Sequence, residues 1–99
     1  MLVRDRMVQE GIWKFKLYVT NKTPVCLHAS TNLQRLCDER LKGKCEVEVI
    51  DILKNPEAAS DEQIVAIPTL IKKSPLPAKR VIGDLSNTER VLAGLDIRG

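Results

Sequence analysis

Residues 12–50, IWKFKLYVTNKTPVCLHASTNLQRLCDERLKGKCEVEVI, contain the pattern that decides the fold. Residues 12–20 alternate between two faces, with apolar side chains on one of them, which is typical of a strand with one buried face. Residues 45–50 alternate in the same way. Between them, apolar residues recur at helical spacing from residue 24 to about residue 42. A strand, a long helix and a second strand form a βαβ unit, so we predict that the two strands are parallel.

Both ends of the predicted helix have their own signals. Thr23 is a good N-cap residue, and Pro24 suits the first helical position, where an N–H would have no partner within the helix. Gly43 follows the last apolar residue of the pattern, so we predict it to be the C′ residue, which commonly has a left-handed backbone.

The second half of the chain carries shorter signals. Two capping boxes, Ser-x-x-Gln from residue 60 and Ser-x-x-Glu from residue 86, predict helices over residues 60–65 and 86–95. Brief strands are predicted over residues 69–72 and 79–82. The predicted order is therefore βαβ followed by αββα.

The composition predicts one small α/β domain. The chain has 99 residues, of which 43% are hydrophobic, so it can build a single core and is not a disordered chain. We expect one domain over residues 1–99, with residues 1–11 as a flexible N-terminal extension. The net charge of +3 is too small for a dedicated nucleic-acid binder, so no nucleic-acid partner is expected.

The charges are unevenly placed along the chain. Residues 1–45 contain nine basic and four acidic residues, whereas residues 46–63 contain one basic and six acidic residues. Blocks of opposite sign can steer a charged partner toward the protein. They can equally form an ordinary solvated surface, and both interpretations stay open.

Cysteine and histidine usage argues against cofactors and covalent frameworks. Cys26, Cys37 and Cys45 have no C-x-x-C spacing and His28 is the only histidine, so neither a disulfide framework nor a metal site is predicted. No glycine-rich phosphate loop is present, and no cofactor is expected. The sequence shows neither the apolar segment of a signal peptide nor the roughly 20 apolar residues of a transmembrane helix. We therefore expect a cytoplasmic protein with reduced thiols and no membrane partner.

The predicted order of elements and one local motif resemble thioredoxin-like proteins. The motif is AIPTL at residues 66–70, which is similar to the Ile-Pro-Thr segment of that family. The resemblance implies that a cis peptide bond precedes Pro68 and that this proline begins a central strand. A trans proline that ends the preceding helix is the alternative, because only about 5–6% of X–Pro bonds in folded proteins are cis.

Thioredoxin-type redox chemistry requires a nucleophilic cysteine at the start of the first helix, where the helix dipole lowers the thiol pKa. In this chain Thr23 occupies the attacking position, and only Cys26, at the resolving position, carries a thiol. We therefore expect no enzyme, and a thiol transferase that uses Cys26 is the least favoured alternative. Cys37 and Cys45 are interpreted as small core residues.

A closer resemblance, to the KaiB family of bacterial clock proteins, covers residues 14–97. The similar segments are KLYV at 16–19, TP at 23–24, VIDILKNP at 49–56, PTL at 68–70, PLP at 75–77, IGDLSN at 82–87 and GLD at 94–96. The DILKNP and IGDLSN segments are the most specific of these. The chain is therefore identified as a divergent member of this family.

This resemblance implies a non-enzymatic protein that binds KaiC, a hexameric ATPase, and helps to time its phosphorylation cycle. It also implies two folds for the C-terminal half. With KaiC bound, the whole chain is thioredoxin-like, in the order βαβαββα. In the self-associated ground state the order is βαββααβ, and the protein forms a homo-oligomer, a dimer or a tetramer.

The sequence offers a physical basis for such a fold switch. Pro68, Pro75 and Pro77 each add a slow choice between cis and trans isomers, with tens to hundreds of seconds for each change. Gly94 and Asp96 match family positions whose replacement biases the switch. The local signals in this half are weak, which fits two packings that differ by only a few kcal/mol.

Three candidate partner-binding residues depart from the family pattern. Glu46 and Glu48 stand where well-studied members carry a small residue and a lysine that faces KaiC, and such a charge reversal weakens binding to an unaltered partner. His28 replaces an arginine associated with the activator KaiA, so KaiA is not an expected partner. Two alternatives follow: a KaiC-type ATPase as partner, or the same fold acting in stress adaptation or in signalling, for example with a histidine kinase.

Overall fold

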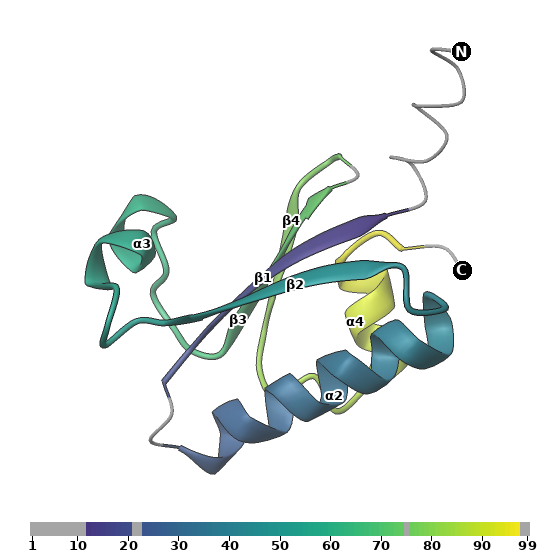
Figure 1. Ribbon diagram of the computed structural model, residues 1–99, viewed down its shortest axis with the longest axis horizontal. Coiled ribbons are helices and arrows are strands. Elements are labelled where there is room, and N and C mark those ends of the chain that lie inside the picture. The colour runs from purple at the N-terminus through teal and green to yellow at the C-terminus, as the bar shows by residue number, and fades with distance from the viewer. Residues whose placement is uncertain (1–11, 21–22, 75, 98–99) are drawn as a thin grey trace.

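The computed structural model describes residues 12–20, 23–74 and 76–97 (Figure 1). The elements follow one another as β1 (Trp13–Val19), α2 (Pro24–Arg40), β2 (Cys45–Asp51), α3 (Pro56–Asp61), β3 (Thr69–Ser74), β4 (Lys79–Ile82) and α4 (Thr88–Gly94). The predicted N-terminal extension, residues 1–11, and the predicted switch residue Pro75 lie outside the described residues.

The strands form one mixed sheet in the order β2-β1-β3-β4. β1 and β2 are parallel, with Trp13 opposite Cys45 and Val19 opposite Asp51. β3 is antiparallel to β1, and β4 is antiparallel to β3. The parallel pair confirms the predicted βαβ unit. The described part of the chain has the thioredoxin-like order βαβαββα, not the alternative ground-state order βαββααβ, because the last element is a helix and no strand follows it.

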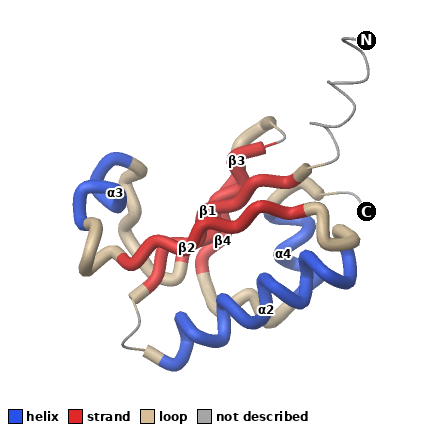
Figure 2. Tube along the Cα trace, in the orientation of Figure 1, coloured by secondary structure: helices blue, strands red, loops and turns tan. Residues whose placement is uncertain are grey.

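Two apolar clusters hold the layers together. α2 and α4 lie on the same side of the sheet, whereas α3 lies beyond the opposite end of the strands from α4 (Figures 1 and 2). Buried side chains between the sheet and the two helices form the larger cluster, which includes Phe15, Leu17, Val19, Leu33, Leu36, Leu70, Leu92 and Leu95. A smaller cluster of Tyr18, Ile50 and Ile71 packs with Ala58 and Ile64 on the other face.

The first predicted capping box is wrong. α3 begins at Pro56, with Asn55 as its N-cap, and Ser60 lies inside the helix. Proline at N1 loses no helical hydrogen bond, so the Asn-Pro pair is the stronger start signal. Gln63, with a φ of 56°, lies just beyond the end of this helix, where the prediction continued it to residue 65.

The start of α2 at Pro24, after Thr23, is as predicted, whereas α2 ends at Arg40 and not near residue 42. Asn87, not Ser86, caps α4, because its side-chain oxygen accepts a hydrogen bond of 3.1 Å from the Arg90 N–H. Lys42, not Gly43, is the first left-handed residue after α2, although Gly43 also has a positive φ, of 74°. Among the described residues, no helix is both long and apolar enough to span a bilayer.

Candidate functional site

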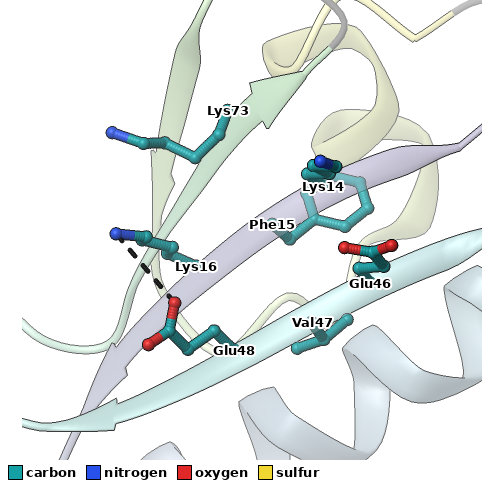
Figure 3. Close-up of a pocket in the computed structure, with 7 residues that line it drawn as sticks. All are labelled: Lys14, Phe15, Lys16, Glu46, Val47, Glu48 and Lys73. Carbon is teal, nitrogen blue, oxygen red and sulfur yellow. Dashed lines mark ion pairs between the residues drawn. The ribbon is translucent and has the colours of Figure 1, made fainter. Parts of the chain in front are cut away.

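The sheet face turned away from α2 carries charged side chains from three strands. In the register of β1 and β2, Lys14 lies opposite Glu46 and Lys16 lies opposite Glu48. Lys73 from β3 extends over the same area as Lys16 (Figure 3). These five charged side chains, together with Phe15 and Val47, line a hollow of about 300 Å³. We call these five charged residues the charged face.

Ion pairs on the charged face are weak and exposed. The Lys16 Nζ lies 4.0 Å from a Glu48 carboxylate oxygen, and the two side chains are 35% and 66% exposed. Pairs of this kind contribute at most about 1 kcal/mol to stability. Lys73 forms a shorter pair, 3.0 Å, with Glu62. Acidic and basic blocks that are separate in the sequence are thus interleaved in space, and the face presents both signs to solvent.

Glu46 and Glu48, two of the predicted partner-binding residues, lie on an edge of the sheet. β2 is the outermost strand on its side, and both glutamates are exposed. On the helix-facing side of the same strand, Val47 and Val49 remain 37% and 53% exposed. The β2 edge therefore presents charged side chains on one face of the sheet and apolar side chains on the other, with the backbone of the outer strand between them.

His28, the third predicted partner-binding residue, lies elsewhere. It is an exposed residue of α2, in the layer on the opposite side of the sheet from the charged face. Its charge acts on Asp84: hydrogen bonds from Ser86 lower the pKa of the Asp84 carboxyl, and the positive charge of His28 lowers it further. The structure therefore brings the two glutamates together but does not bring His28 to them.

The two described prolines of the predicted fold switch flank β3. Pro68 is buried directly before this strand, and the Ile67–Pro68 bond is cis, as predicted. The Thr69 hydroxyl donates a 2.6 Å hydrogen bond to the Ala66 carbonyl across this corner. Leu76–Pro77 is also cis, and Pro77 is exposed.

Gly94 and Asp96 lie at the end of α4. Gly94 is the last residue of the helix and packs so closely on β4 that an added Cβ would lie 2.8 Å from the Val81 Cγ2. Asp96 has a left-handed backbone, with a φ of 58°. Both positions therefore sit where the last helix meets its neighbours, and a substitution there acts on the packing of this helix.

Lys72 is a residue that the sequence analysis did not single out as a core residue. It is only 2% exposed, and its Nζ lies 5.7 Å from the centre of the Trp13 ring. Burial lowers the pKa of this amine, while the negative charge of Asp96 raises it. The alternation of β3, which places residue 72 on the same face as Leu70, was the signal that could have identified it.

The thioredoxin-type redox position does not contain a thiol pair. Cys26 is buried, and its sulfur accepts a 3.5 Å hydrogen bond from the Thr20 N–H. Cys37 lies eleven residues further along the same helix, about 16 Å away at 1.5 Å per residue. The Thr23 hydroxyl, at the attacking position, is buried without a hydrogen-bond partner. Among the described residues, no group of histidine, cysteine and acidic side chains could hold a metal ion.

Comparisons with known proteins agree with this geometry. The KaiB domain model matches residues 16–97. The circadian clock oscillator protein KaiB of Thermostichus vulcanus is 48% identical over 83% of this chain and 76% of its own length. The circadian clock protein KaiB3 of a Synechocystis species is 48% identical over 83% of this chain and 80% of its own.

Solved structures support the fold. The N-terminal domain of Synechococcus elongatus SasA matches with a TM-score of 0.68 at 19% identity, over 86% of this chain and 84% of that one. Mitochondrial thioredoxin 3 from Saccharomyces cerevisiae also has a TM-score of 0.68, at 14% identity, over 96% of this chain and 88% of its own.

These structural matches establish a thioredoxin-like fold, and the sequence matches establish the family. KaiB proteins are non-enzymatic clock regulators, which agrees with the missing thiol pair at the redox position. The match over residues 16–97 begins inside β1 and includes the other three strands and all of the described helices. The chain therefore belongs to the KaiB family of circadian clock proteins.

Proposed function

We propose that this chain binds a KaiC-type ATPase and modulates its phosphorylation and timing cycle without catalysing a reaction itself. The observation that carries the proposal is the family match over residues 16–97 in a chain with thioredoxin-like order. The resemblance described above associates this order with the KaiC-bound form. We also propose that the protein acts in the cytoplasm, because a KaiC-type ATPase would act there.

The charged face supports a protein surface as the partner. Glu46 and Glu48 are exposed, and each has a lysine of β1 opposite it in the register. Because the Lys16–Glu48 pair is long and exposed, little free energy is lost when a partner replaces it. We propose that the ATPase partnered with this chain presents basic residues to β2, which would compensate for the departure from the family pattern.

Binding can be tested with the hexameric KaiC-type ATPase that occurs in the same cell. The full chain and the ATPase are incubated for a day with ATP or ADP and separated by size exclusion. We expect co-elution, and we expect Glu46→Lys with Glu48→Lys to weaken binding at least tenfold. The matched control is Glu39→Lys with Glu57→Lys, which makes the same change of net charge at exposed positions outside the charged face. Absence of a complex with the wild-type chain in both nucleotides would reject the proposal.

A second candidate function is favoured by the same two glutamates. If they prevent contact with any KaiC-type ATPase, the fold serves stress adaptation or signalling through another partner, such as a histidine kinase. Glu46→Ala with Glu48→Lys restores residue types similar to those of the family. Binding by this variant, where the wild-type chain shows none, would support the second candidate; equal binding by both would reject it.

We also propose that the C-terminal half can take the ground-state order and that the isolated chain then forms a dimer or a tetramer. The support is the weak packing of two C-terminal elements: α3 has no buried residue, and β4 has 4 residues, of which none is buried. Light scattering coupled to size exclusion measures the mass directly. A chain that stays monomeric at all concentrations, with the amide spectrum of a single thioredoxin-like state, would contradict this proposal.

A further inference from the structure

The sign of the charge changes across the sheet face that is turned away from α2. One row of neighbouring residues crosses all four strands, from Glu48 of β2 through Lys16 of β1 and Ile71 of β3 to Arg80 of β4. Lys73 lies two residues beyond Ile71 on β3 and therefore on the same face. This face is thus acidic at the β2 edge and basic over β1, β3 and β4. A partner with acidic groups over β3 and β4 would match this distribution of charge.

A second hollow lies over β3 and β4, next to the hollow of the charged face. It has a volume of about 390 Å³ and is lined by Glu62, Ile71, Lys73, Ala78, Lys79 and Arg80. We call it the basic hollow, because three of these residues are basic and only one is acidic. Lys73 lines both hollows, so a ligand of the basic hollow would contact a residue that also belongs to the charged face.

Glu62, the residue that follows α3, supplies a carboxylate to the basic hollow. Its carboxylate oxygen lies 3.0 Å from the Lys73 Nζ, and the Arg80 Nη2 donates a 3.1 Å hydrogen bond to the Glu62 carbonyl. The Lys73 and Glu62 side chains are 35% and 30% exposed, so a carboxylate from solution can reach the amine. Helix α3 has no buried residue, so displacing the Glu62 side chain does not open the apolar core.

We propose that the basic hollow binds an acidic segment of a partner protein, and that a carboxylate of this segment replaces Glu62 at Lys73. Glu62 is then an intramolecular competitor, which lowers the affinity of the unbound chain for acidic partners. The exposed guanidinium of Arg80 provides a second cation beside Lys73, and its planar group suits a carboxylate. The inference rests on the proposed function only for the identity of the partner. It adds acidic groups over β3 and β4 to the basic groups proposed opposite β2.

The test uses the full chain and a hexaglutamate peptide, without any ATPase. Titration calorimetry at low ionic strength measures the affinity, because salt screens exposed charges. We expect Glu62→Gln to bind the peptide about fivefold more tightly than the wild-type chain, since Lys73 then has no internal carboxylate to release. The matched control is Glu57→Gln, which removes the same charge from an exposed position of α3 and should change the affinity by less than about twofold.

Lys73 provides the second arm of the test. Lys73→Gln should weaken peptide binding about fivefold and should abolish the gain from Glu62→Gln when the two substitutions are combined. Lys42→Gln, at an exposed position in the turn after α2, is the matched control and should have little effect. Equal gains from Glu62→Gln and Glu57→Gln would overturn the proposal. A gain that persists without Lys73, or a Glu62→Gln variant that does not bind the peptide, would also overturn it.

Two further measurements separate the proposed ligand from its alternatives. Inorganic pyrophosphate also offers anionic oxygens to Lys73 and Arg80, and tighter binding of pyrophosphate than of hexaglutamate would overturn the assignment to a protein partner. The KaiC-type ATPase is then added to the same variants. A chain that binds the peptide but not the ATPase would reject the proposed function and leave this inference standing, whereas binding of the ATPase without any binding of the peptide would reject this inference alone.

Discussion

The N-terminal and C-terminal halves of this domain differ in how their helices are stabilised. α2 has 17 residues and buries five of them against the sheet, whereas α4 has 7 residues and buries Val91 and Leu92. α3 has 6 residues and buries none. A long amphipathic helix can be recognised from its own sequence, but short helices of this kind are stable only through tertiary packing.

The C-terminal elements pack on the apolar surface of the N-terminal βαβ unit. Val91, Leu92 and Leu95 complete the same apolar cluster that β1 and α2 build with Leu17 and Leu33. Strand β3 also pairs with β1, the strand of the N-terminal half that lies inside the sheet. The C-terminal elements therefore depend on a surface that the βαβ unit provides. This dependence agrees with the proposal that the C-terminal half is the part that can change its fold.

The largest effect that we expect comes from truncating the shared core. Leu17→Ala removes a fully buried side chain and should lower the free energy of unfolding by about 3 kcal/mol, measured in urea. The matched control is Val49→Ala, at the position opposite Leu17 in the register, where the side chain is 53% exposed. Its loss should stay below about 1 kcal/mol. Equal losses would show that the β2 edge is as well packed as the centre of the sheet.

The next effect compares the N-caps of the two halves. Asn87→Ala removes the 3.1 Å hydrogen bond to the Arg90 N–H and should lower the free energy of unfolding by about 1 kcal/mol. Thr23 makes no side-chain capping bond, and its hydroxyl is buried without a partner. Thr23→Ala should therefore leave stability unchanged or raise it slightly. The reverse order of the two losses would contradict the different cap geometries.

Gly94 tests the contact between α4 and β4. In the wild-type background, Gly94→Ala should lower stability by up to about 1 kcal/mol, because the new Cβ lies 2.8 Å from the Val81 Cγ2. In a Val81→Ala background the obstacle is gone, and the better helix propensity of alanine should raise stability by a few tenths to about 1 kcal/mol. A thermodynamic cycle in urea measures the coupling. The same sign in both backgrounds would show that Val81 simply moves aside.

The smallest effect at neutral pH concerns Tyr18 of β1, whose phenol is affected by the charges of Glu48 in the N-terminal half and Glu62 in the C-terminal half. Burial raises the pKa of its phenol above the ordinary 10.0, and the charges of Glu62 and Glu48 raise it further. Phenolate absorbance of the single tyrosine should show a midpoint above pH 10.0 in the folded chain. Glu62→Gln should lower this midpoint more than Glu48→Gln, and the opposite ranking would place Tyr18 closer to β2.

The sign of the stability effect follows from the raised pKa of Tyr18. Below the ordinary pKa of 10.0 the phenol is protonated in both states, so its contribution to stability is fully present. Above it, the unfolded chain loses the proton first, and the contribution is lost as the pH rises through the pKa of the folded state. Stability from this group should therefore be constant at neutral pH and fall only in alkaline solution.

Much of the fold could be predicted from local patterns because several signals act within one element. The period-2 alternation around Phe15 and Leu17 and the helical spacing after Pro24 identified the parallel βαβ unit. The Asn55-Pro56 start of α3 was missed, since a capping box at Ser60 competed with it in the sequence. The exposed positions of Glu46, Glu48 and His28 could also be predicted.

Other features arise only when distant segments meet. The burial of Lys72 beside Trp13 depends on the register between β3 and β1. Strand register also places the lysines of β1 opposite the glutamates of β2. His28 lies on α2, in another layer.

Local residue preferences were therefore sufficient for the N-terminal half, and the resemblance of short segments was sufficient for membership of the family. The order of the C-terminal half, αββα in the described residues, was decided by the tertiary structure. Its helices are too short to be stable alone. Its strand β3 pairs with β1 of the other half, and β4 in turn pairs with β3. Where local free energies are small, the packing surface offered by the rest of the chain, or by a partner, decides which fold is lowest in free energy.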